Sequence, residues 1–374
     1  MIKVAISGTG LFVPDHVITN DELVESYNQH AKLFNSQNQD KIAAGTVQEK
    51  PLSSSEFIEK ASGIKQRYVL EKTGILDPNR MHPHLPARKD EELSLMAEIA
   101  VKAGRQAIEA AGKTAADIDA VICSAANMQR PYPAMAIEIQ KELGIQGFGY
   151  DMNVACSSAT FGLEQAVNAV RCGTARAVLM VNPEITSAHH AWADRDCHFI
   201  FGDVCTAVVV ERLETAKPGS FEVLDTKLVT DFSSNIRNNF GFMNRSEDSD
   251  PNARDKLFMQ EGRKVFKDVC PMAAEHMASQ LQKLGIDSAA GVKRYWLHQA
   301  NLNMNLLIAK KLLGNAEPTA DKAPVILDEF ANTASAGSVI AFHRHHSDFQ
   351  ANDVGVICSF GAGYSIGSVV VRKT

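Results

Sequence analysis

Short apolar strands that alternate with amphipathic helical stretches constrain the fold of this chain more than any other feature. Residues 177–181 and 206–210 are continuous apolar runs of strand length, typical of strands buried on both faces. A helical stretch that opens at Asp90 repeats its apolar residues at the helical period: Leu93, Met96, Ile99, Ala100, Ala103 and Ala107. This alternation predicts an α/β fold in which layers of helices cover sheets.

The remaining elements continue the alternation. Strands are expected at residues 4–8, 119–124, 149–155, 221–229, 294–297, 354–359 and 365–372, and helices at 134–143, 157–170, 256–284 and 301–313. A short helix at 21–24 has Asn20 as its expected cap. The polar, Gln- and Asn-rich stretch at 28–55 has no clear period, and we interpret it as an insertion or a mobile cap.

The chain has 374 residues, a length that fits two domains. Composition turns polar at 211–220, around a Lys-Pro-Gly turn, so we predict an N-terminal half at 1–215 and a C-terminal half at 216–374. Each half has an apolar strand that leads to a chemically interesting residue, Cys156 in the first and His298 in the second. We interpret the halves as duplicated units whose strand ends meet at one site.

Charge and cysteine usage exclude several classes. The formal net charge is -6 and no basic run is present, so no nucleic-acid partner is expected. No apolar stretch approaches membrane-span length, and the start is too short and polar for a secretory signal, so we expect a cytoplasmic protein without a membrane partner. The 7 cysteines include no CxxC pair, which leaves a metal site or a disulfide framework without support.

Cys156 lies where an apolar strand runs into a helical stretch, within the sequence NVACSSATFG at 153–162. The small residues after it let another backbone approach, as in the nucleophile turns of hydrolases. Free N–H groups and the helix dipole at such a position stabilise a thiolate, so we expect the pKa of this thiol to be lowered. The alternative is a buried structural cysteine, the interpretation we adopt for the other six.

His298 and Asn332 are candidate uncharged donors in the second half. His298 follows an apolar strand at the mouth of a helix, where imidazolium is disfavoured, and Asn332 lies in the small-residue run ANTASAGS. A satisfied buried histidine and a capping asparagine are the alternatives. Two neutral donors beside a thiolate suit a malonyl thioester that loses CO2, because they stabilise the enolate oxygen as its charge develops.

The sequence FGAGYSIG at 360–367 follows an expected strand. Its glycines allow a main-chain N–H to approach a ligand, so an amide here and the N–H of Cys156 are candidates for an oxyanion hole. A dinucleotide-binding turn is the alternative. We reject it because the motif lies near the C-terminus with no acidic residue after it.

Six segments together carry a resemblance to a known family: ACSS at 155–158, FGD at 201–203, EGRKVF at 261–266, HQAN at 298–301, NTAS at 332–335 and FGAG at 360–363. In this order, over nearly the whole chain, they resemble β-ketoacyl-acyl-carrier-protein synthase III of the thiolase superfamily. The resemblance implies a five-layered αβαβα thiolase fold with two duplicated halves and a homodimer. It also implies an acyltransferase of fatty acid biosynthesis that condenses an acyl-CoA with malonyl-acyl carrier protein through an acyl-cysteine, with no cofactor.

The resemblance also assigns residues. The catalytic triad falls on Cys156, His298 and Asn332, and the oxyanion hole on the amides of Cys156 and Ala362. CoA contacts fall on Phe57, Arg195, Gly262 and Asn301, the acyl pocket on Tyr132 and Phe360, and the carrier-protein patch on Lys267, Lys310 and Lys311. For any one of these lysines, a solvated helix face is the alternative.

This chain departs from the family pattern in several places. Phe57 stands where the family usually has a tryptophan that stacks on adenine, Ala61 replaces an arginine, and Asn303 replaces a basic residue. A Phe57–Arg195 clamp is the expected substitute. Residues 28–55 and 71–91 are longer than in the acetyl-using enzymes, and we expect them to wall a longer acyl tunnel for a medium-chain primer such as octanoyl.

Two other classes stay open at this point. One is a related acyl-CoA condensing thiolase or a quinolone- or polyketide-type synthase. Many of these use a glutamate or second cysteine as base, for which Glu184 is the only nearby candidate, and for Glu184 itself we expect a surface or loop role. The other is a non-catalytic homologue that binds carrier protein, against which the complete triad argues.

Overall fold

The computed structural model describes residues 2–248, 250 and 253–374. Nine strands form a mixed sheet in the order β11-β12-β13-β8-β1-β7-β6-β4-β5. Their bounds are β1 Val4–Phe12, β4 Ala120–Ser124, β5 Phe148–Met152, β6 Ala177–Glu184, β7 Val204–Arg212, β8 Phe221–Ser233, β11 Arg294–Leu297, β12 Val354–Gly361 and β13 Gly363–Lys373. Only two residue pairs join β1 to β8, so the sheet has two parts that meet along a short contact.

The strand pairing of one part repeats in the other. β4 is parallel to β6, and β6 and β1 are both antiparallel to β7. In the same way β11 is parallel to β12, and β12 and β8 are both antiparallel to β13. The boundary between halves at 215 and 216 stays a prediction.

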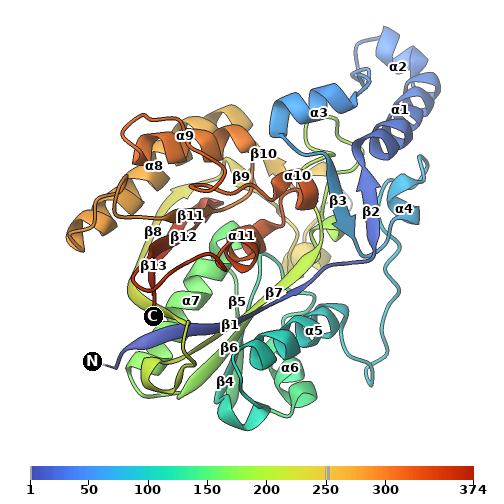
Figure 1. The fold of residues 1–374 in the computed structure, drawn as a ribbon. Coiled ribbons are helices and arrows are strands. Elements are labelled where there is room, and N and C mark those ends of the chain that lie inside the picture. The colour runs from blue at the N-terminus through green and yellow to red at the C-terminus, as the bar shows by residue number, and fades with distance from the viewer. Residues whose placement is uncertain (1, 249, 251–252) are drawn as a thin grey trace.

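Helices form three further layers around the two parts of the sheet. α5 (Leu95–Ala110) and α6 (Met135–Leu143) pack on strands of the first part, and α8 (Gly262–Lys283) packs on the second, with α9 (Leu302–Leu312) against it. α7 (Ser158–Arg171) contacts strands of both parts and, with α11 (Gly337–Arg344), lies at the centre of the molecule (Figure 1). The predicted order of layers, helix–sheet–helix–sheet–helix, is therefore present.

The core divides along the same layers. One cluster of buried side chains fills the central layer around α7 and α11, and two others lie under α5 and under α8. α7 and α11 are short on charge and rich in small residues, because each is covered on more than one side. This central layer carries the residues that follow Cys156 and Asn332.

The polar segment at 28–55 is more ordered than its composition indicated. α1 runs over Asn20–Gln37, and its cap is Thr19, whose hydroxyl and Glu22 form a reciprocal capping box. The prediction that Asn20 caps a short helix is wrong, since the Asn20 amide instead donates to the carbonyl of Ile64. Leu23, Tyr27 and Ala31 recur every fourth residue and are buried, which anchors the long helix.

Around α1 lies a small subassembly that the sequence did not predict. It contains α2 (Gln39–Ala43), α3 (Ser55–Ser62), α4 (Thr73–Leu76) and an antiparallel pair of strands, β2 (His16–Thr19) and β3 (Gln66–Val69). It stands to one side of the layers (Figure 1). Elsewhere, α5 begins at Leu95 after its cap Ser94, later than expected from Asp90. α8 begins at Gly262, because 256–261 form a turn and β10 (Met259–Gln260), paired with β9 (Ile236–Arg237).

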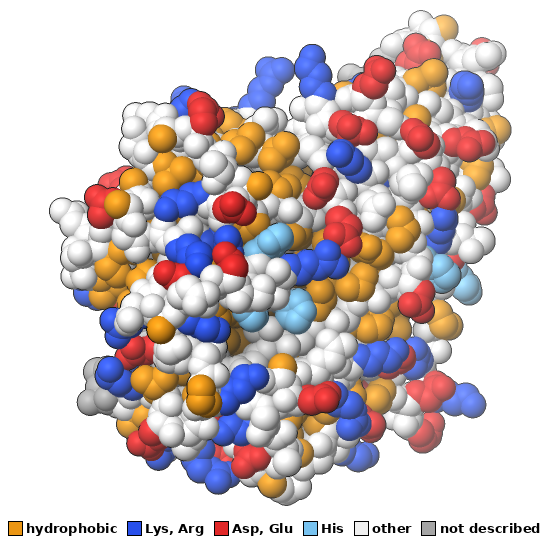
Figure 2. All heavy atoms as spheres, in the orientation of Figure 1, with side chains coloured by type: hydrophobic (Ala, Val, Ile, Leu, Met, Phe, Trp, Pro, Cys, Tyr) orange, Lys and Arg blue, Asp and Glu red, His pale blue; other side chains and the backbone are white. Residues whose placement is uncertain are grey.

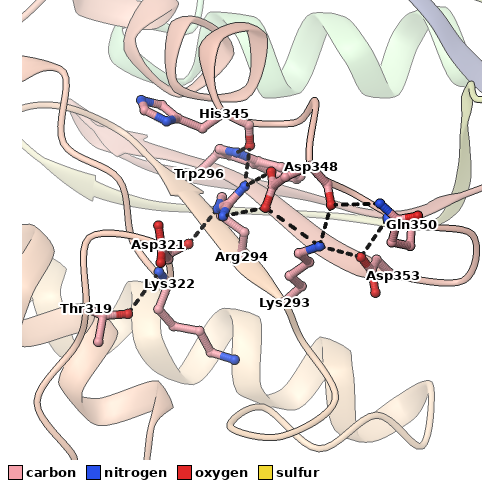
Figure 3. A network of polar contacts seen from close by, with 10 residues as sticks. All are labelled: Lys293, Arg294, Trp296, Thr319, Asp321, Lys322, His345, Asp348, Gln350 and Asp353. Carbon is pink, nitrogen blue, oxygen red and sulfur yellow. Dashed lines mark hydrogen bonds and ion pairs between the residues drawn. The ribbon is translucent and has the colours of Figure 1, made fainter.

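β11, the strand that leads to His298, is anchored at its start by charged groups. Arg294 is largely buried and binds both carboxylate oxygens of Asp348, at 2.6 and 3.1 Å. The carbonyl of His345 accepts from Arg294 and from Trp296 Nε1 (Figure 3). This network fixes the loop after α11 to β11, and so fixes the strand that carries His298.

None of the helices in the described ranges is both long and apolar enough to cross a bilayer.

Candidate active site

Cys156 lies in a tight turn between β5 and α7. Ala155 has a φ of 45°, in the left-handed region, and its N–H donates to Asn153 Oδ1 at 2.9 Å, which supports the strained conformation. Residues 155–157 form a single 3-10 turn before α7 begins at Ser158. The thiol is 9% exposed, so a reacting group must reach it through the protein.

The expected thiolate is wrong for the resting protein. Burial raises the pKa of the Cys156 thiol to about 11, and the N–H groups of Ala362 and of Cys156 itself offset this only in part. Removal from water disfavours the charged sulfur more than the helix start favours it. Cys156 therefore rests as a thiol and must lose its proton as it reacts.

The turn between β12 and β13 lies directly against Cys156. A Cβ built on Gly361 would be 2.5 Å from Cys156 Cβ and 2.9 Å from its sulfur, so this position requires glycine. The next residue, Ala362, offers its N–H to the sulfur. The N–H groups of Ala362 and of Cys156 both interact with the thiol, and paired main-chain donors of this kind are what an oxyanion hole requires.

His298 follows β11 and is 1% exposed. Burial lowers its pKa to about 4, which confirms the expected neutral imidazole, although burial rather than the helix mouth is the cause. Its Nδ1 has no hydrogen-bond partner among the described residues, and the ring of Phe360 packs against the imidazole at 5.3 Å between centroids. A neutral imidazole offers one N–H to a ligand.

Asn332 lies in a turn that matches the Cys156 turn. Ala334 has a φ of 47° and donates its N–H to Asn332 Oδ1 at 2.9 Å, as Ala155 does to Asn153. A 3-10 turn and then α11 follow. The counterpart of Cys156 is therefore Ser335, and the predicted correspondence with His298 is wrong. The repeated signal Asn-x-Ala-Cys and Asn-x-Ala-Ser was available in the sequence.

The fold brings these segments together. The turn at 155–157 contacts the turn at 334–336, and β12 contacts the Cys156 turn. Gly337, at the start of α11, lies so close to Gln299 that a Cβ would be 3.1 Å from its backbone nitrogen. Because β11 pairs with β12 in register, His298 comes out beside the strand end that meets Cys156. Three segments far apart in the chain thus converge on one thiol.

The predicted CoA-contacting residues have varied surroundings. The Arg195 guanidinium lies 3.8 Å from the Phe57 ring centroid, so the two expected residues are paired. They stack directly on each other, with no space between them for an adenine ring. Asn301 caps α9 and also donates to the carbonyl of Ala61 at 2.7 Å, which makes it a link between α9 and α3. Gly262 is exposed at the start of α8.

A cavity of about 1360 Å³ lies between the 28–55 segment and the body of the molecule. Its wall includes 47–51 and 80–87, both from the longer segments singled out in the sequence, and apolar side chains such as Met96, Met128 and Trp192. Its lining reaches Glu184, which lies near Cys156, although Cys156 itself is not among the described residues that line the cavity. The two predicted acyl-pocket residues do not line this cavity: Tyr132, on a loop that by the family resemblance reaches the acyl pocket of a second copy, is 82% exposed, and Phe360 is buried behind His298.

The three predicted carrier-protein lysines lie on neighbouring helices. Lys267 is exposed on α8. Burial raises the pKa of Cys270, which is one turn after Lys267 on α8, and the charge of Lys311 on α9 offsets this in part. Lys310 forms an ion pair with Glu317. On the face drawn in Figure 2, basic and acidic side chains are interspersed, and hydrophobic side chains reach the surface between α9 and α3.

Comparisons with known proteins agree with this geometry. Family models described as 3-oxoacyl-[acyl-carrier-protein] synthase III match residues 150–231 and, for the C-terminal part, 281–373. The β-ketodecanoyl-[acyl-carrier-protein] synthase of Pseudomonas aeruginosa is 58% identical over 351 residues, 94% of this chain and 100% of that protein. The β-ketoacyl-[acyl-carrier-protein] synthase III of Methylococcus capsulatus is 27% identical over 372 residues, 98% of each chain.

Solved structures show the same fold. The synthase III of Aquifex aeolicus superposes with a TM-score of 0.75 at 23% identity and covers 99% of each chain. That of Pseudomonas aeruginosa gives 0.76 at 20% identity, over 99% of this chain and 98% of the other.

The fold and the thiol at its centre define a condensing enzyme with the thiolase fold, an acyltransferase. With a full-length relative at 58% identity, this chain belongs to the β-ketoacyl-acyl-carrier-protein synthase III family. That family uses acyl-CoA as a substrate.

Proposed function

We propose that this enzyme condenses a medium-chain acyl-CoA, with octanoyl-CoA as the preferred primer, with malonyl-acyl carrier protein to give β-ketoacyl-acyl carrier protein, CoA and CO2. The observation that carries the proposal is the convergence of the Cys156 turn, the Gly361-Ala362 turn and His298 around one buried thiol. The catalytic roles of Cys156, His298, Asn332 and Ala362 are part of this proposal.

In the first half-reaction, the sulfur of Cys156 attacks the thioester carbonyl of the acyl-CoA. A bond forms between sulfur and the acyl carbon, the bond to the CoA sulfur breaks, and CoA leaves as a thiol with the proton that Cys156 gives up. Negative charge develops on the carbonyl oxygen, where the N–H groups of Cys156 and Ala362 stabilise it. Preformed donors matter here, because the resting thiol is protonated.

In the second half-reaction, the bond between the malonyl CH2 carbon and its carboxylate breaks. CO2 leaves, and the electron pair of that bond forms the enolate of the thioester. His298 and Asn332 donate hydrogen bonds to the enolate oxygen. Both are uncharged donors, and they stabilise this oxygen as its negative charge develops. Asn332 Oδ1 is already taken by the Ala334 N–H, which leaves the amide NH2 for the substrate. The enolate carbon attacks the acyl carbon, the bond to Cys156 breaks, and the released thiolate takes up one proton from water.

The choice of primer rests on two observations. The relative at 58% identity is named a β-ketodecanoyl synthase, and removal of the two carbons added by malonate leaves octanoyl. In addition, the segments that are longer than in acetyl-using enzymes line the cavity of about 1360 Å³. The apolar side chains in its wall, such as Met96, Met128 and Trp192, stabilise a chain in proportion to the apolar area that they bury, beside charged residues such as Lys50 and Arg80 in the same wall.

The primer is tested with a panel of acyl-CoAs from acetyl to dodecanoyl, each offered with malonyl-carrier protein, with the rate of product formation as the measurement. We expect kcat/KM for octanoyl-CoA to exceed that for acetyl-CoA by at least about tenfold, because six additional methylenes transfer from water into an apolar site. The C156A variant is the background control. A preference for acetyl-CoA contradicts the primer assignment but leaves the condensation intact.

The partner and location are also proposed. β5 is an edge strand of the described chain, and Ile137, Phe148 and Tyr150 are exposed on or beside it. An uncovered edge with apolar side chains favours a second copy of this chain, so we propose a homodimer. We propose a cytoplasmic location, where acyl-CoA and carrier protein occur together.

A further inference from the structure

Glu184 is a buried acid that lies beside the reacting groups without being one of them. It ends β6 and is 1% exposed, so the surface or loop role expected for it is wrong. Its Oε1 accepts hydrogen bonds from the N–H and the hydroxyl of Ser335, the former at 3.2 Å, and from the N–H of Ala126 at 3.0 Å. No cation pairs with it in any ion pair formed by the described residues.

The internal duplication explains the position. β6 and β12 both have eight residues and occupy matching places in the two parts of the sheet, so Glu184 matches Gly361. Gly361 lies against Cys156, and Glu184 lies against Ser335, the counterpart of Cys156. The end of β12 carries glycine, which leaves room for the Cys156 thiol. The end of β6 carries the Glu184 side chain, which binds the turn that contains Ser335.

A continuous chain of hydrogen bonds runs through Glu184 from one turn to the other. Ser335 donates to Glu184, which also accepts from the N–H of Ala126. The carbonyl of Ala126 accepts from Asn153 Nδ2 at 2.7 Å, and Asn153 Oδ1 accepts from Ala155 beside Cys156. Ser335 is three residues from Asn332. The chain therefore ties the turn of the enolate donor to the turn of the nucleophile.

We propose that Glu184 is the positioning residue that holds Asn332 in register with Cys156 for the decarboxylation half-reaction, and that it acts as an uncharged acid. This inference rests on the proposed function. A carboxylate here would add negative charge near the malonyl carboxylate and the enolate, which are anions, whereas the protonated acid keeps Oε1 as an acceptor for the donors of Ser335 and Ala126. Burial raises the pKa of Glu184 to about 8, the neighbouring Asp203 carboxyl adds to this, and the hydrogen bonds from Ser335 and Ala126 offset it only in part, which agrees with a neutral group at pH 7.

The test separates the two half-reactions in E184A and E184Q. Acylation of Cys156 by octanoyl-CoA is followed by intact-protein mass, and CO2 release by carboxyl-labelled malonyl-carrier protein. We expect E184A to acylate within about threefold of wild type but to release CO2 at least tenfold more slowly. We expect E184Q, which resembles the protonated acid, to restore CO2 release to within about threefold.

The pH profile provides a second readout. Wild-type CO2 release should fall above pH 8 as Glu184 ionises, and the fall should be absent in E184Q. The matched control is E211Q, which neutralises another buried acid, on β7, paired with Lys113; it should match wild type in both half-reactions. Acylation itself reports that each variant is folded.

The inference is overturned if E184A releases CO2 as fast as E211Q, if E184A loses both half-reactions equally, or if E184Q shows the same alkaline fall as wild type. If the wild type itself takes up no octanoyl group and releases no CO2, the proposed function fails instead, so the two failures are distinguishable.

Discussion

At the scale of single residues, Cys156 shows how burial and hydrogen bonding compete over one thiol. The strand-to-helix turn supplies N–H groups, but the sulfur is almost out of reach of water, and desolvation prevails. A resting thiol is less exposed to adventitious oxidation, since the thiolate is the reactive form. Catalysis then depends on donors that act as charge develops, rather than on a standing anion.

The raised pKa predicts how Cys156 reacts with iodoacetamide. Between pH 7 and 9 the alkylation rate should rise about tenfold per pH unit without a plateau, because only the thiolate reacts and its fraction grows that way below the pKa. Peptide mass spectrometry gives the rate, and exposed Cys172, at the end of α7, is the internal reference. A plateau near neutral pH would show that the thiolate is already present at rest.

His298 illustrates what residue type and position can predict. Its place after an apolar strand indicated a neutral imidazole, and the structure confirms it. Glu184 shows the opposite case. The sequence offered no sign that the end of β6 faces Ser335, 151 residues away, because that contact exists only through the duplicated fold.

At the scale of elements, the alternation of apolar runs predicted every strand of the large sheet to within a few residues. It failed where local signals compete. Thr19 and Asn20 are both good caps, and only the Thr19–Glu22 box decides between them. α11 was missed because GSVIAFHR is buried on nearly all sides and has no amphipathic period. The Gln- and Asn-rich segment looked aperiodic because its few buried residues are outnumbered.

The Arg294–Asp348 pair at the start of β11 predicts an effect on stability. Its hydrogen bonds with Arg294 lower the pKa of Asp348 to about 2, so the pair stabilises the fold above the ordinary carboxyl pKa of about 4 and loses this contribution as pH falls towards 2. We expect D348N to lower the free energy of unfolding by about 1 kcal/mol at pH 7, a value reduced by the exposure of the carboxylate.

Urea denaturation at pH 7 and pH 3 measures this effect, and the difference from wild type should shrink at pH 3. The matched control is D321N, because Asp321 joins the same network through its main-chain carbonyl (Figure 3). Equal stability of D348N and D321N at pH 7 would mean that the ion pair contributes nothing.

At the scale of the whole molecule, duplication places the site. The two parts of the large sheet share one central layer of helices, and each half sends one tight turn into that layer, with Cys156 on one and Ser335 on the other. Layer order and family could be predicted from the sequence. The pairing of the two turns was missed although Asn-x-Ala-Cys and Asn-x-Ala-Ser repeat in the sequence, because Cys156 and His298 are alike in chemistry whereas Cys156 and Ser335 are alike in position.

The subassembly around α1 and the large cavity belong to the same scale. Their existence follows from added segments, but their shape depends on long-range packing such as that of Tyr27 against His198. A sequence pattern cannot specify such packing, because each partner looks ordinary alone.

The most direct test of the account is a single turnover observed by intact-protein mass. The enzyme is loaded with octanoyl-CoA, freed of CoA and then mixed with carboxyl-labelled malonyl-carrier protein. We predict one octanoyl group on Cys156. The loss of this group from the protein should coincide with the appearance of labelled CO2 and 3-oxodecanoyl-carrier protein. The H298A and N332A variants should keep the octanoyl group and release little CO2. Discharge of H298A and N332A at the wild-type rate, or an octanoyl group on a residue other than Cys156, would contradict it.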